Sequence, residues 1–348
     1  MLERLRLYYA RHERAVAPAF FAAGFVFDML TLGRIDSWRV IGQQALYLAV
    51  ILVLLLQPFF EEGRYSRYRT AAVHFLLGAL LNLYALFFFK SSSLLVSFSF
   101  LAFLVALLLA NESERFKAQG PAFKFALLSL CLLSFFAVLV PVLAGSIGTA
   151  VFLLSMAAGA LPLAAAGWWL RHRGGRQKIL VPLGVVLAGF LAAYLFRVIP
   201  PVPLSIPFIG VYHGVERTEQ GYLLAHERPR WRVWHNGDQR FVAQPGDKVY
   251  VYFRVFSPTH FSDQVLLRWY RRMSRDGERW MLQDTIPIRI VGGREAGFRG
   301  YGVKTHYQAG EWKVQVETTD GREIGRVYFD LETVPEAKPR SLASELDA

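Results

Sequence analysis

The chain has 348 residues, of which 54% are hydrophobic, with a mean hydropathy of +0.30 and a formal net charge of +12. The charge lies mainly in the first 204 residues, which hold 18 basic and 8 acidic side chains, whereas the rest hold 21 and 19. Basic residues placed beside apolar stretches indicate membrane topology and argue against nucleic acid binding. The single cysteine, Cys131, excludes an internal disulfide.

Long apolar stretches fill the first 199 residues, and each is near the roughly 20 residues that a helix needs to cross a bilayer. The seven stretches are Ala15–Leu32, Val40–Phe60, Thr70–Phe89, Leu94–Ala110, Phe125–Leu143, Thr149–Leu170 and Ile179–Ile199. We therefore expect a membrane α-helical bundle of about seven transmembrane helices.

The loops between these stretches alternate in charge. The N-terminal arm and segments 61–69, 111–124 and 171–178 carry 14 Lys and Arg residues, whereas the loops on the opposite side hold Arg34, Arg39 and Lys90. Short loops rich in Lys and Arg stay in the cytoplasm. The charge pattern therefore predicts a multi-pass protein of the bacterial inner membrane, with its N-terminus cytoplasmic and everything after Pro200 periplasmic.

A composition break at Pro200-Pro201-Val202-Pro203 separates the membrane region from the rest, because successive prolines do not continue a helix. We expect a transmembrane domain over 1–199, a Pro-rich linker over 200–207 and a periplasmic domain over 208–334. The segment 335–348 is rich in Pro, Lys, Ser and Glu, which predicts a disordered tail.

Short alternating stretches separated by turn residues are typical of strands, and they fill the periplasmic domain. The eight expected strands are Trp231–His235, Arg240–Ala243, Lys248–Phe256, Gln264–Arg272, Arg279–Ile290, Phe298–His306, Glu311–Thr318 and Glu323–Leu331. Asn236-Gly237 lies between the first two and predicts a hairpin. This number of strands in about 130 residues indicates an all-β Ig-like sandwich.

Several runs resemble an uncharacterised bacterial family that joins a multi-span region to a C-terminal domain of unknown function. The runs are Gly24–Asp36, Phe89–Ser93, Ala110–Glu112 and Gly310–Gly325, the last being a G-x-W-x-V strand that leads into an Asp-Gly hairpin. The resemblance implies an envelope membrane protein and implies no reaction. Similar domains tend to read His-x-Trp-Tyr where this chain has Leu267-Arg268-Trp269-Tyr270, so the resemblance gives no role to a histidine there.

Charged side chains near the outer ends of the first and third spans form the first candidate site. Asp28, Thr31, Arg34, Asp36 and Lys90 are predicted to gather there as an outer polar cluster. An ionisable group near hydrocarbon usually has a partner or a purpose. The cluster is then either an ion-pair network that locks the helix ends or a polar vestibule for a ligand, and we favour the ion-pair network.

Aromatic and cationic side chains alternate on the predicted strands and form the second candidate site. The expected binding face comprises Trp269, Tyr270, Arg299, Tyr301, Lys304 and Trp312. Aromatic rings beside guanidinium groups suit sugars, peptides and acidic head groups. A sandwich also needs tryptophans in its core, so some of these rings are expected to be packing residues.

No catalytic, metal-binding or cofactor-binding motif is found in the sequence. We therefore expect a non-enzymatic membrane protein without cofactor or metal, whose periplasmic sandwich binds a protein, glycan or lipid partner in an accessory or scaffold role. Membrane lipid is an expected partner, nucleic acid is not, and the oligomeric state is not indicated. In the alternative, the helical bundle transports a small molecule or handles lipid, and the β domain gates or recruits.

Overall fold

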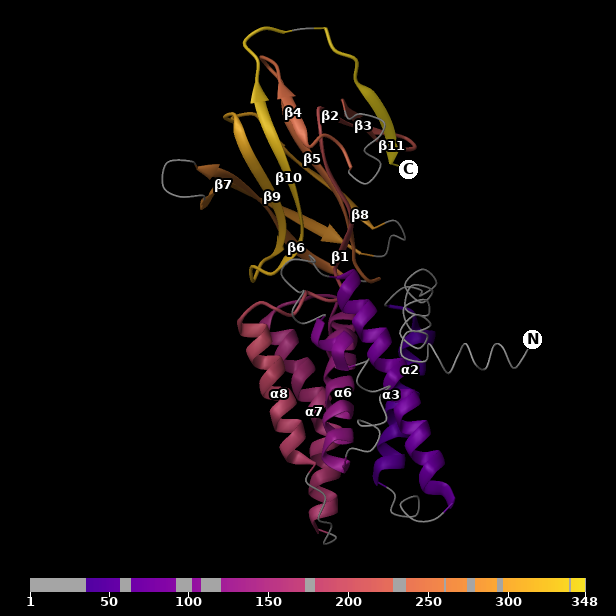
Figure 1. Cartoon of the computed structure of the whole chain (residues 1–348). Helices are drawn as coiled ribbons and strands as arrows, with labels where there is room; N and C mark the ends of the chain where they lie inside the picture. Colours follow the sequence, from indigo (N-terminus) through magenta and orange to yellow (C-terminus); the bar gives the residue numbers. More distant parts are fainter. Residues whose placement is uncertain are drawn as a thin grey trace, which may run out of the picture.

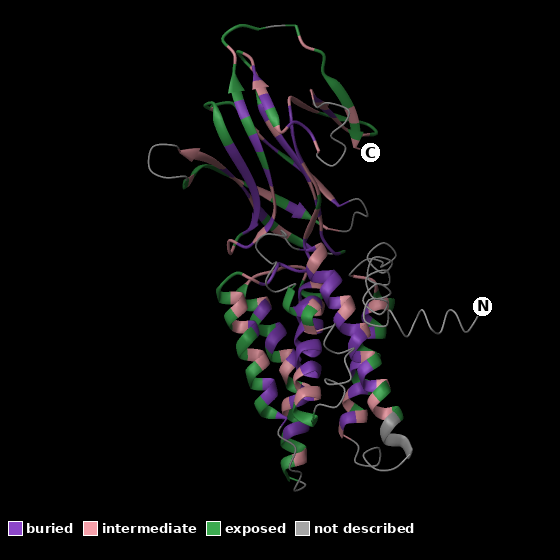
Figure 2. Ribbon diagram, in the orientation of Figure 1, coloured by how far each residue is buried: buried purple, intermediate pink, exposed green. Residues whose placement is uncertain are grey.

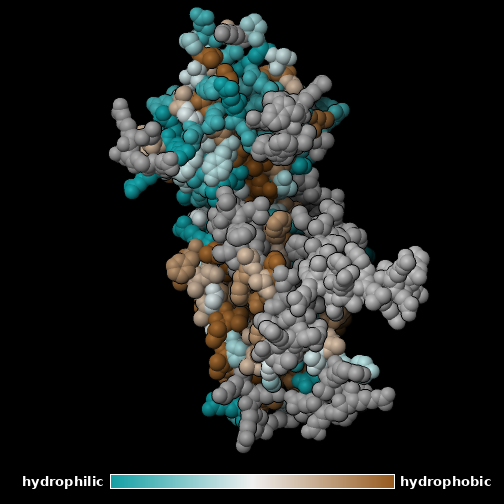
Figure 3. All heavy atoms as spheres, viewed as in Figure 1, coloured by the Kyte–Doolittle hydropathy of each residue, from teal (hydrophilic) through white to brown (hydrophobic). Residues whose placement is uncertain are grey.

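The computed structural model of the chain divides into a helical half and a β half (Figure 1). It describes residues 36–56, 64–91, 102–107, 120–172, 179–227, 236–259, 261–273, 279–292, 297–337 and 339–347. In Figure 3 the visible described surface is mostly apolar in the helical half and mostly polar in the β half.

The described helical half contains five labelled helices and the short helical segment 102–107, and four of the five are long and apolar enough to cross a membrane. The helices are α2 (Trp38–Leu56), α3 (Arg64–Lys90), α6 (Pro121–Ala144), α7 (Thr149–His172) and α8 (Leu180–Leu195). The fifth, α8, has only 16 residues. The four long helices agree with the second, third, fifth and sixth predicted spans.

The predicted count of seven spans is not supported. The first, Ala15–Leu32, lies outside the described residues, and of Leu94–Ala110 only 102–107 are described, as helix. The seventh ends early, because α8 stops at Leu195 and Arg197 adopts a left-handed backbone with φ of 58°. A left-handed residue followed by successive prolines does not continue a helix.

Many residues of the described helices are exposed (Figure 2), and large apolar residues are among them. Leu153, Leu161 and Val185 are 50%, 65% and 68% exposed, although they lie on apolar helices. Contiguous exposed apolar surface of this kind is typical of a face that contacts lipid. Exposed Trp168 and Trp169 lie near the end of α7, where amphipathic rings favour the membrane interface.

Two sheets pack face to face in the β half and enclose its hydrophobic core. The strands that build them are β1 (Ser205–Tyr212), β4 (Arg240–Ala243), β5 (Val249–Phe256), β6 (Ser262–Met273), β7 (Arg279–Val291), β8 (Phe298–Lys304), β9 (Gly310–Thr318) and β10 (Glu323–Thr333). The five-stranded sheet has the order β4-β10-β9-β6-β7, and the three-stranded sheet has the order β1-β5-β8. Pro287 lies in β7, an edge strand, where the missing N–H is tolerated.

The last six predicted strands, from Lys248 onward, are confirmed within a few residues as β5 to β10. The predicted hairpin at Asn236-Gly237 is less well matched. Its first arm, Trp231–His235, lies outside the described residues, and its second arm is β4, which pairs parallel with β10. Strand β1 begins at Ser205, inside the segment expected to be a linker.

A third sheet lies outside the sandwich. It contains β2 (Gly214–Thr218), β3 (Gly221–His226) and β11 (Ala343–Asp347), in the order β11-β3-β2. The expectation of disorder from Pro335 onward is therefore wrong at Ala343–Asp347. Composition predicts disorder because this segment has few apolar residues to bury, but backbone pairing with β3 and two carboxylates hold β11 in place.

Polar contacts join the helical bundle to the base of the sandwich. Ser262 N–H donates to Gly145 O (2.9 Å), Ile147 N–H to Asp263 Oδ2 (3.0 Å), Tyr194 O–H to Asp320 Oδ2 (2.9 Å) and Thr259 N–H to Asp36 Oδ2 (3.2 Å). These contacts involve α8, the segment before α2 and the segment between α6 and α7. The starts of α2 and α7 and the ends of α6 and α8 therefore share one end of the bundle, beside the β half (Figure 1).

Candidate functional site

The six residues of the expected binding face do not share one surface. Trp269 and Trp312 lie between the two sheets and are 0% and 2% exposed, with ring centroids 6.4 Å apart. Lys304 also points inward, where its Nζ lies 3.3 Å from Asp284 Oδ2 and 5.6 Å from the Trp312 ring. These three residues belong to the core of the sandwich.

Arg299 and Tyr301 point to the opposite face of the three-stranded sheet. Arg299 Nε lies 3.3 Å from Asp347 Oδ2 on β11. The ring of Tyr301 lies 6.2 Å from that of Tyr222 and 6.3 Å from that of Tyr250. Both residues therefore face the third sheet, which the sequence did not predict.

Tyr270 points outward from the five-stranded sheet and belongs to a third surface. Its ring lies 4.5 Å from Lys313 Nζ on β9, and the same ammonium lies 5.1 Å from the Trp280 ring on β7. We call the outward side of β6, β7, β9 and β10 the charged aromatic face. It comprises Arg268, Tyr270, Trp280, Glu311, Lys313, Gln315, Glu317, Glu323, Arg326 and Tyr328.

Two charged residues of β9, Lys313 and Glu317, are buried although they lie on this outward face. Lys313 is 9% and Glu317 is 6% exposed, because long side chains of the neighbouring strands cover them. Burial lowers the pKa of Lys313, and the nearby Arg326 cation lowers it further. Burial likewise raises the pKa of Glu317, although Arg268 lies 3.2 Å from its carboxylate and opposes that shift. Shifted pKa values of this kind are frequent at functional sites and also occur in structural ion-pair networks.

A hydrogen-bonded network fixes the rest of the face. Arg326 donates through two nitrogens to the Glu323 carboxylate and through Nη1 to Tyr328 Oη at 2.9 Å. Gln315 Nε2 donates to Glu323 Oε2 at 2.7 Å. The Trp280 and Tyr328 rings, on opposite sides of Lys313, lie 5.8 Å apart. The network fixes the position of the Tyr328 ring, against which the Trp280 ring packs.

A hollow of about 300 Å³ opens beside these rings at the end of the sheet away from the membrane helices. Its lining comprises Gln239, Arg240, Trp280, Glu311, Trp312, Tyr328, Phe329 and Asp330. Thr318, at the other end of β9, lies near the membrane junction, so the hollow is about 23 Å from that junction at the usual rise per residue. An indole and a phenol ring with two carboxylates, an amide and a guanidinium offer both apolar faces and hydrogen-bonding groups.

Sequence reasoning left Lys313, Trp280 and Tyr328 out of the binding face. The signal that identifies them is the strand register, which pairs Tyr328 with Lys313 and Lys313 with Tyr270. A bulge between Trp269 and Tyr270 shifts the pairing with β7. Pairing of this kind is a tertiary property and is not visible as a period along one strand.

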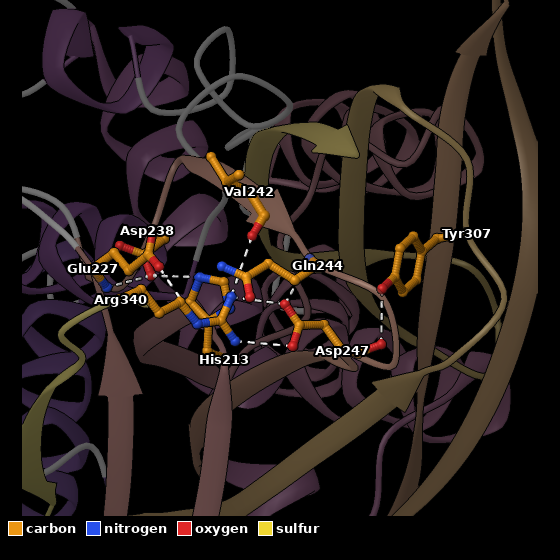
Figure 4. A network of polar contacts seen from close by, with 8 residues as sticks. All are labelled: His213, Glu227, Asp238, Val242, Gln244, Asp247, Tyr307 and Arg340. Carbon is orange, nitrogen blue, oxygen red and sulfur yellow. Dashed lines mark hydrogen bonds and ion pairs between the residues drawn. The ribbon is translucent and has the colours of Figure 1, made fainter. Parts of the chain in front are cut away.

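A second polar network surrounds His213 and links distant parts of the chain (Figure 4). His213 packs on the Phe241 ring at 3.9 Å, and its Nε2 lies 3.7 Å from Asp238 Oδ2. Burial lowers the pKa of His213 to about 4, helped by the Arg340 cation. Arg340 makes a bidentate ion pair with Asp247, at 2.7 and 2.9 Å. The neutral, buried imidazole lacks an adjacent nucleophile among the described residues, so we assign it a packing role.

The outer polar cluster of the membrane half stays a prediction. Asp28, Thr31 and Arg34 lie outside the described residues. Asp36 accepts hydrogen bonds from Thr259, and Lys90 is the last residue of α3. No group of three or more His, Cys, Asp or Glu is placed to hold a metal ion within the described ranges.

Residues 262–331 match a family described as a protein of unknown function, DUF2914. The segment runs from β6 into β10 and includes Trp280, Lys313 and Tyr328, as well as Gly310–Gly325. A domain of unknown function in the C-terminal half agrees with the expected resemblance. No curated protein matches the chain.

Three solved structures with distant similarity to the chain illustrate the comparison. An immunoglobulin-like protein from Pseudomonas aeruginosa is 17% identical with a TM-score of 0.23, over 38% of this chain and 98% of that chain. A β-glucosidase from Kluyveromyces marxianus is 16% identical with a TM-score of 0.19, over 25% of this chain and 13% of that chain. An alkylpurine DNA glycosylase from Pseudomonas fluorescens is 12% identical with a TM-score of 0.22, over 86% of this chain and 100% of that chain. Scores this low carry no argument about function.

Proposed function

We propose that the chain is a non-enzymatic integral protein of the bacterial inner membrane whose Ig-like sandwich faces the periplasm and binds a glycan in an accessory role. The observation that supports this proposal is the 300 Å³ hollow at the end of the charged aromatic face. Its distance from the membrane helices lets a ligand of the envelope reach it. The basic loops predicted on the opposite side of the membrane support the orientation.

The chemistry of the hollow suits a hydroxyl-rich ligand. The Trp280 and Tyr328 rings offer apolar faces to the C–H side of a sugar ring. Glu311 and Asp330 offer carboxylate oxygens that accept hydrogen bonds from hydroxyl groups, and Arg240 offers donors. Because Arg326 holds the Tyr328 hydroxyl and Arg272 holds the Glu311 carboxylate, ordering these two side chains adds little entropic cost to binding.

The test is calorimetric titration of the detergent-solubilised full-length protein with a tetramer of N-acetylglucosamine, together with co-sedimentation on insoluble peptidoglycan. Replacing both rings, Trp280→Ala with Tyr328→Ala, is expected to weaken binding at least tenfold, equivalent to about 1.4 kcal/mol or more. The matched control is Met281→Ala, because Met281 is 51% exposed on the same strand. The proposal is contradicted if neither probe binds, or if the two substitutions leave the affinity unchanged.

A second candidate function, lipid handling by the bundle, rests on an apolar hollow of about 440 Å³. Its described lining comes from 102–107, α6 and the segment from Val185 to Val198, and it includes Phe103, Leu130 and Phe190. A hollow with almost no polar lining suits an acyl chain. The bundle then binds lipid in addition to anchoring the protein.

Two glycines on α8 allow a direct test of this second function. Gly189 lines the apolar hollow and has nothing within 4 Å of an added Cβ, so Gly189→Leu is expected to fill the hollow without a clash. Gly184 is equally open and does not line the hollow, so Gly184→Leu is the control. Native mass spectrometry is expected to show a retained lipid in the unchanged protein and in Gly184→Leu, and none in Gly189→Leu. Equal lipid retention by both variants contradicts the lipid-handling function.

A further inference from the structure

Strand β11 lies at the edge of the third sheet and turns two acidic side chains toward the sandwich. It pairs antiparallel with β3, from Ala343 opposite His226 to Asp347 opposite Tyr222. Because side chains alternate along a strand, Glu345 and Asp347 share one face. Leu346 points the other way and is 47% exposed.

The Asp347 carboxylate enters a basic, aromatic site on the outer side of the β1-β5-β8 sheet. Arg254 Nη1 lies 3.3 Å from its Oδ1, and Arg299 Nε lies 3.3 Å from its Oδ2. The Tyr252 hydroxyl also donates to Oδ2. Burial raises the pKa of Tyr252, and the bond to Asp347 raises it further, so the phenol stays protonated as a donor.

Glu345 enters the same site two residues earlier. Its Oε1 accepts a hydrogen bond from Tyr212 Oη at 2.8 Å, and its Oε2 lies 3.8 Å from His226 Nε2. Tyr212 is fully buried, and its ring lies 6.5 Å from that of Tyr252. The donors for the two carboxylates therefore lie on β1, β3, β5 and β8, which form the site that β11 covers.

The acidic strand contributes little apolar contact of its own. None of its five residues is buried, and the neighbouring Leu342 is 37% exposed. Its attachment consists of main-chain pairing with β3 and of the two carboxylates. A second acidic strand offers the same groups, so exchange replaces each interaction by an equivalent one.

Arg340 anchors the segment that leads into β11. Its bidentate ion pair with Asp247 and its contact with Glu227 at 3.6 Å lie outside the acidic-strand site (Figure 4). Displacement of β11 from β3 therefore leaves the preceding segment attached at Arg340. The exchange involves only the residues after that anchor.

We propose that the site formed by Tyr212, Tyr252, Arg254, Arg299 and the edge of β3 docks extended acidic peptide segments with carboxylates two residues apart, and that β11 occupies it as an internal ligand which a partner protein's acidic strand replaces. Main-chain pairing to an open sheet edge supplies affinity, and the two carboxylate positions supply specificity. The proposal is independent of glycan binding, which concerns the other outer face of the sandwich.

The experiment measures fluorescence anisotropy of a labelled peptide with the sequence of residues 341–347, Ser-Leu-Ala-Ser-Glu-Leu-Asp, added to the full-length protein. In a variant protein with Glu345→Gln and Asp347→Asn, β11 is held more weakly in the site. This variant, called the weakened receptor, is expected to bind the peptide at least tenfold more tightly than the unchanged protein. A peptide carrying the same two substitutions is expected to bind that receptor at least tenfold more weakly. Equal binding of the two peptides overturns the proposal.

Two further sets of substitutions in the protein test where the peptide binds. Arg299→Gln, added to the weakened receptor, is expected to abolish binding, whereas Arg289→Gln on the exposed β7 edge is expected to leave it unchanged. Leu223 and Leu346 are register partners, so Leu223→Cys with Leu346→Cys allows β11 to be locked by oxidation with both carboxylates intact. Peptide binding by the oxidised form at the level of the reduced form overturns the proposal.

Discussion

Tyr194, near the end of α8, donates a hydrogen bond to Asp320 in the turn between β9 and β10, with 2.9 Å between the two oxygens. Asp320 also accepts from Arg322 at 3.0 Å, and the Arg322 guanidinium lies 4.9 Å from the centre of the Tyr194 ring. Although burial raises the pKa of Asp320, the Arg322 cation and these hydrogen bonds bring it below its usual value. The last helix of the bundle and the five-stranded sheet are thus joined by an ionised carboxylate.

Replacing Asp320 tests how strongly this junction contributes to stability. Asp320→Ala leaves Arg322, which is 7% exposed, without the carboxylate that pairs with it. We expect a loss of about 2 to 4 kcal/mol, because an uncompensated buried charge is costly. Thermal unfolding of the solubilised protein measures the change. Glu332→Ala breaks an exposed pair with Arg240 and is expected to shift the midpoint little, so equal shifts contradict the prediction.

Acidification is expected to destabilise the protein through His213. Its folded-state pKa of about 4 lies below the value of about 6.5 expected in the unfolded chain. Between these two values the unfolded state binds the extra proton, so stability is lost as the pH falls from 6.5 toward 4, by up to about 3 kcal/mol. His213→Gln removes the titrating group. Unfolding midpoints at pH 7 and pH 4.5 are expected to differ less in this variant, and an unchanged difference contradicts the assignment.

Trp269 is expected to be a packing residue, although it was part of the predicted binding face. Its side chain is 0% exposed and contacts the Trp312 and Phe329 rings edge to face. Trp269→Ala is therefore expected to cost about 3 to 5 kcal/mol of unfolding free energy. Tyr301→Ala, at a residue that is 43% exposed, is the comparison and is expected to cost much less. Chemical denaturation that shows similar losses for both contradicts this division.

Substitution of two glycines with positive φ allows the cost of backbone strain to be measured apart from the cost of a steric clash. Gly237 has φ of 64°, and a Cβ there lies 2.1 Å from Val211 O, whereas Gly246 has φ of 90° with open space around it. Gly246→Ala is expected to cost about 1 kcal/mol through backbone strain alone. Gly237→Ala is expected to cost clearly more, because the β1 backbone must move. Equal unfolding midpoints for the two variants contradict the clash at Gly237.

Local pattern predicted much of the architecture. Apolar length predicted the helices now seen as α2, α3, α6 and α7, and alternation predicted β5 to β10, because both properties depend on neighbours along the chain. The break at Pro200 also lies close to the start of β1 at Ser205. Composition failed at β11, since its stability comes from pairing with a distant strand and two buried donors.

Within the β half, the residue types that suit binding were visible in the sequence, but the surfaces that they share were not. Alternation alone shows that Trp269 and Tyr270 face opposite sides, yet it does not say which side is enclosed. Pairing of β9 with β6 and β10 decided that Lys313 lies beside Tyr270, and the third sheet decided that Arg299 meets Asp347. Register and layer order arise from contacts between residues far apart in sequence, so only the tertiary structure sets them.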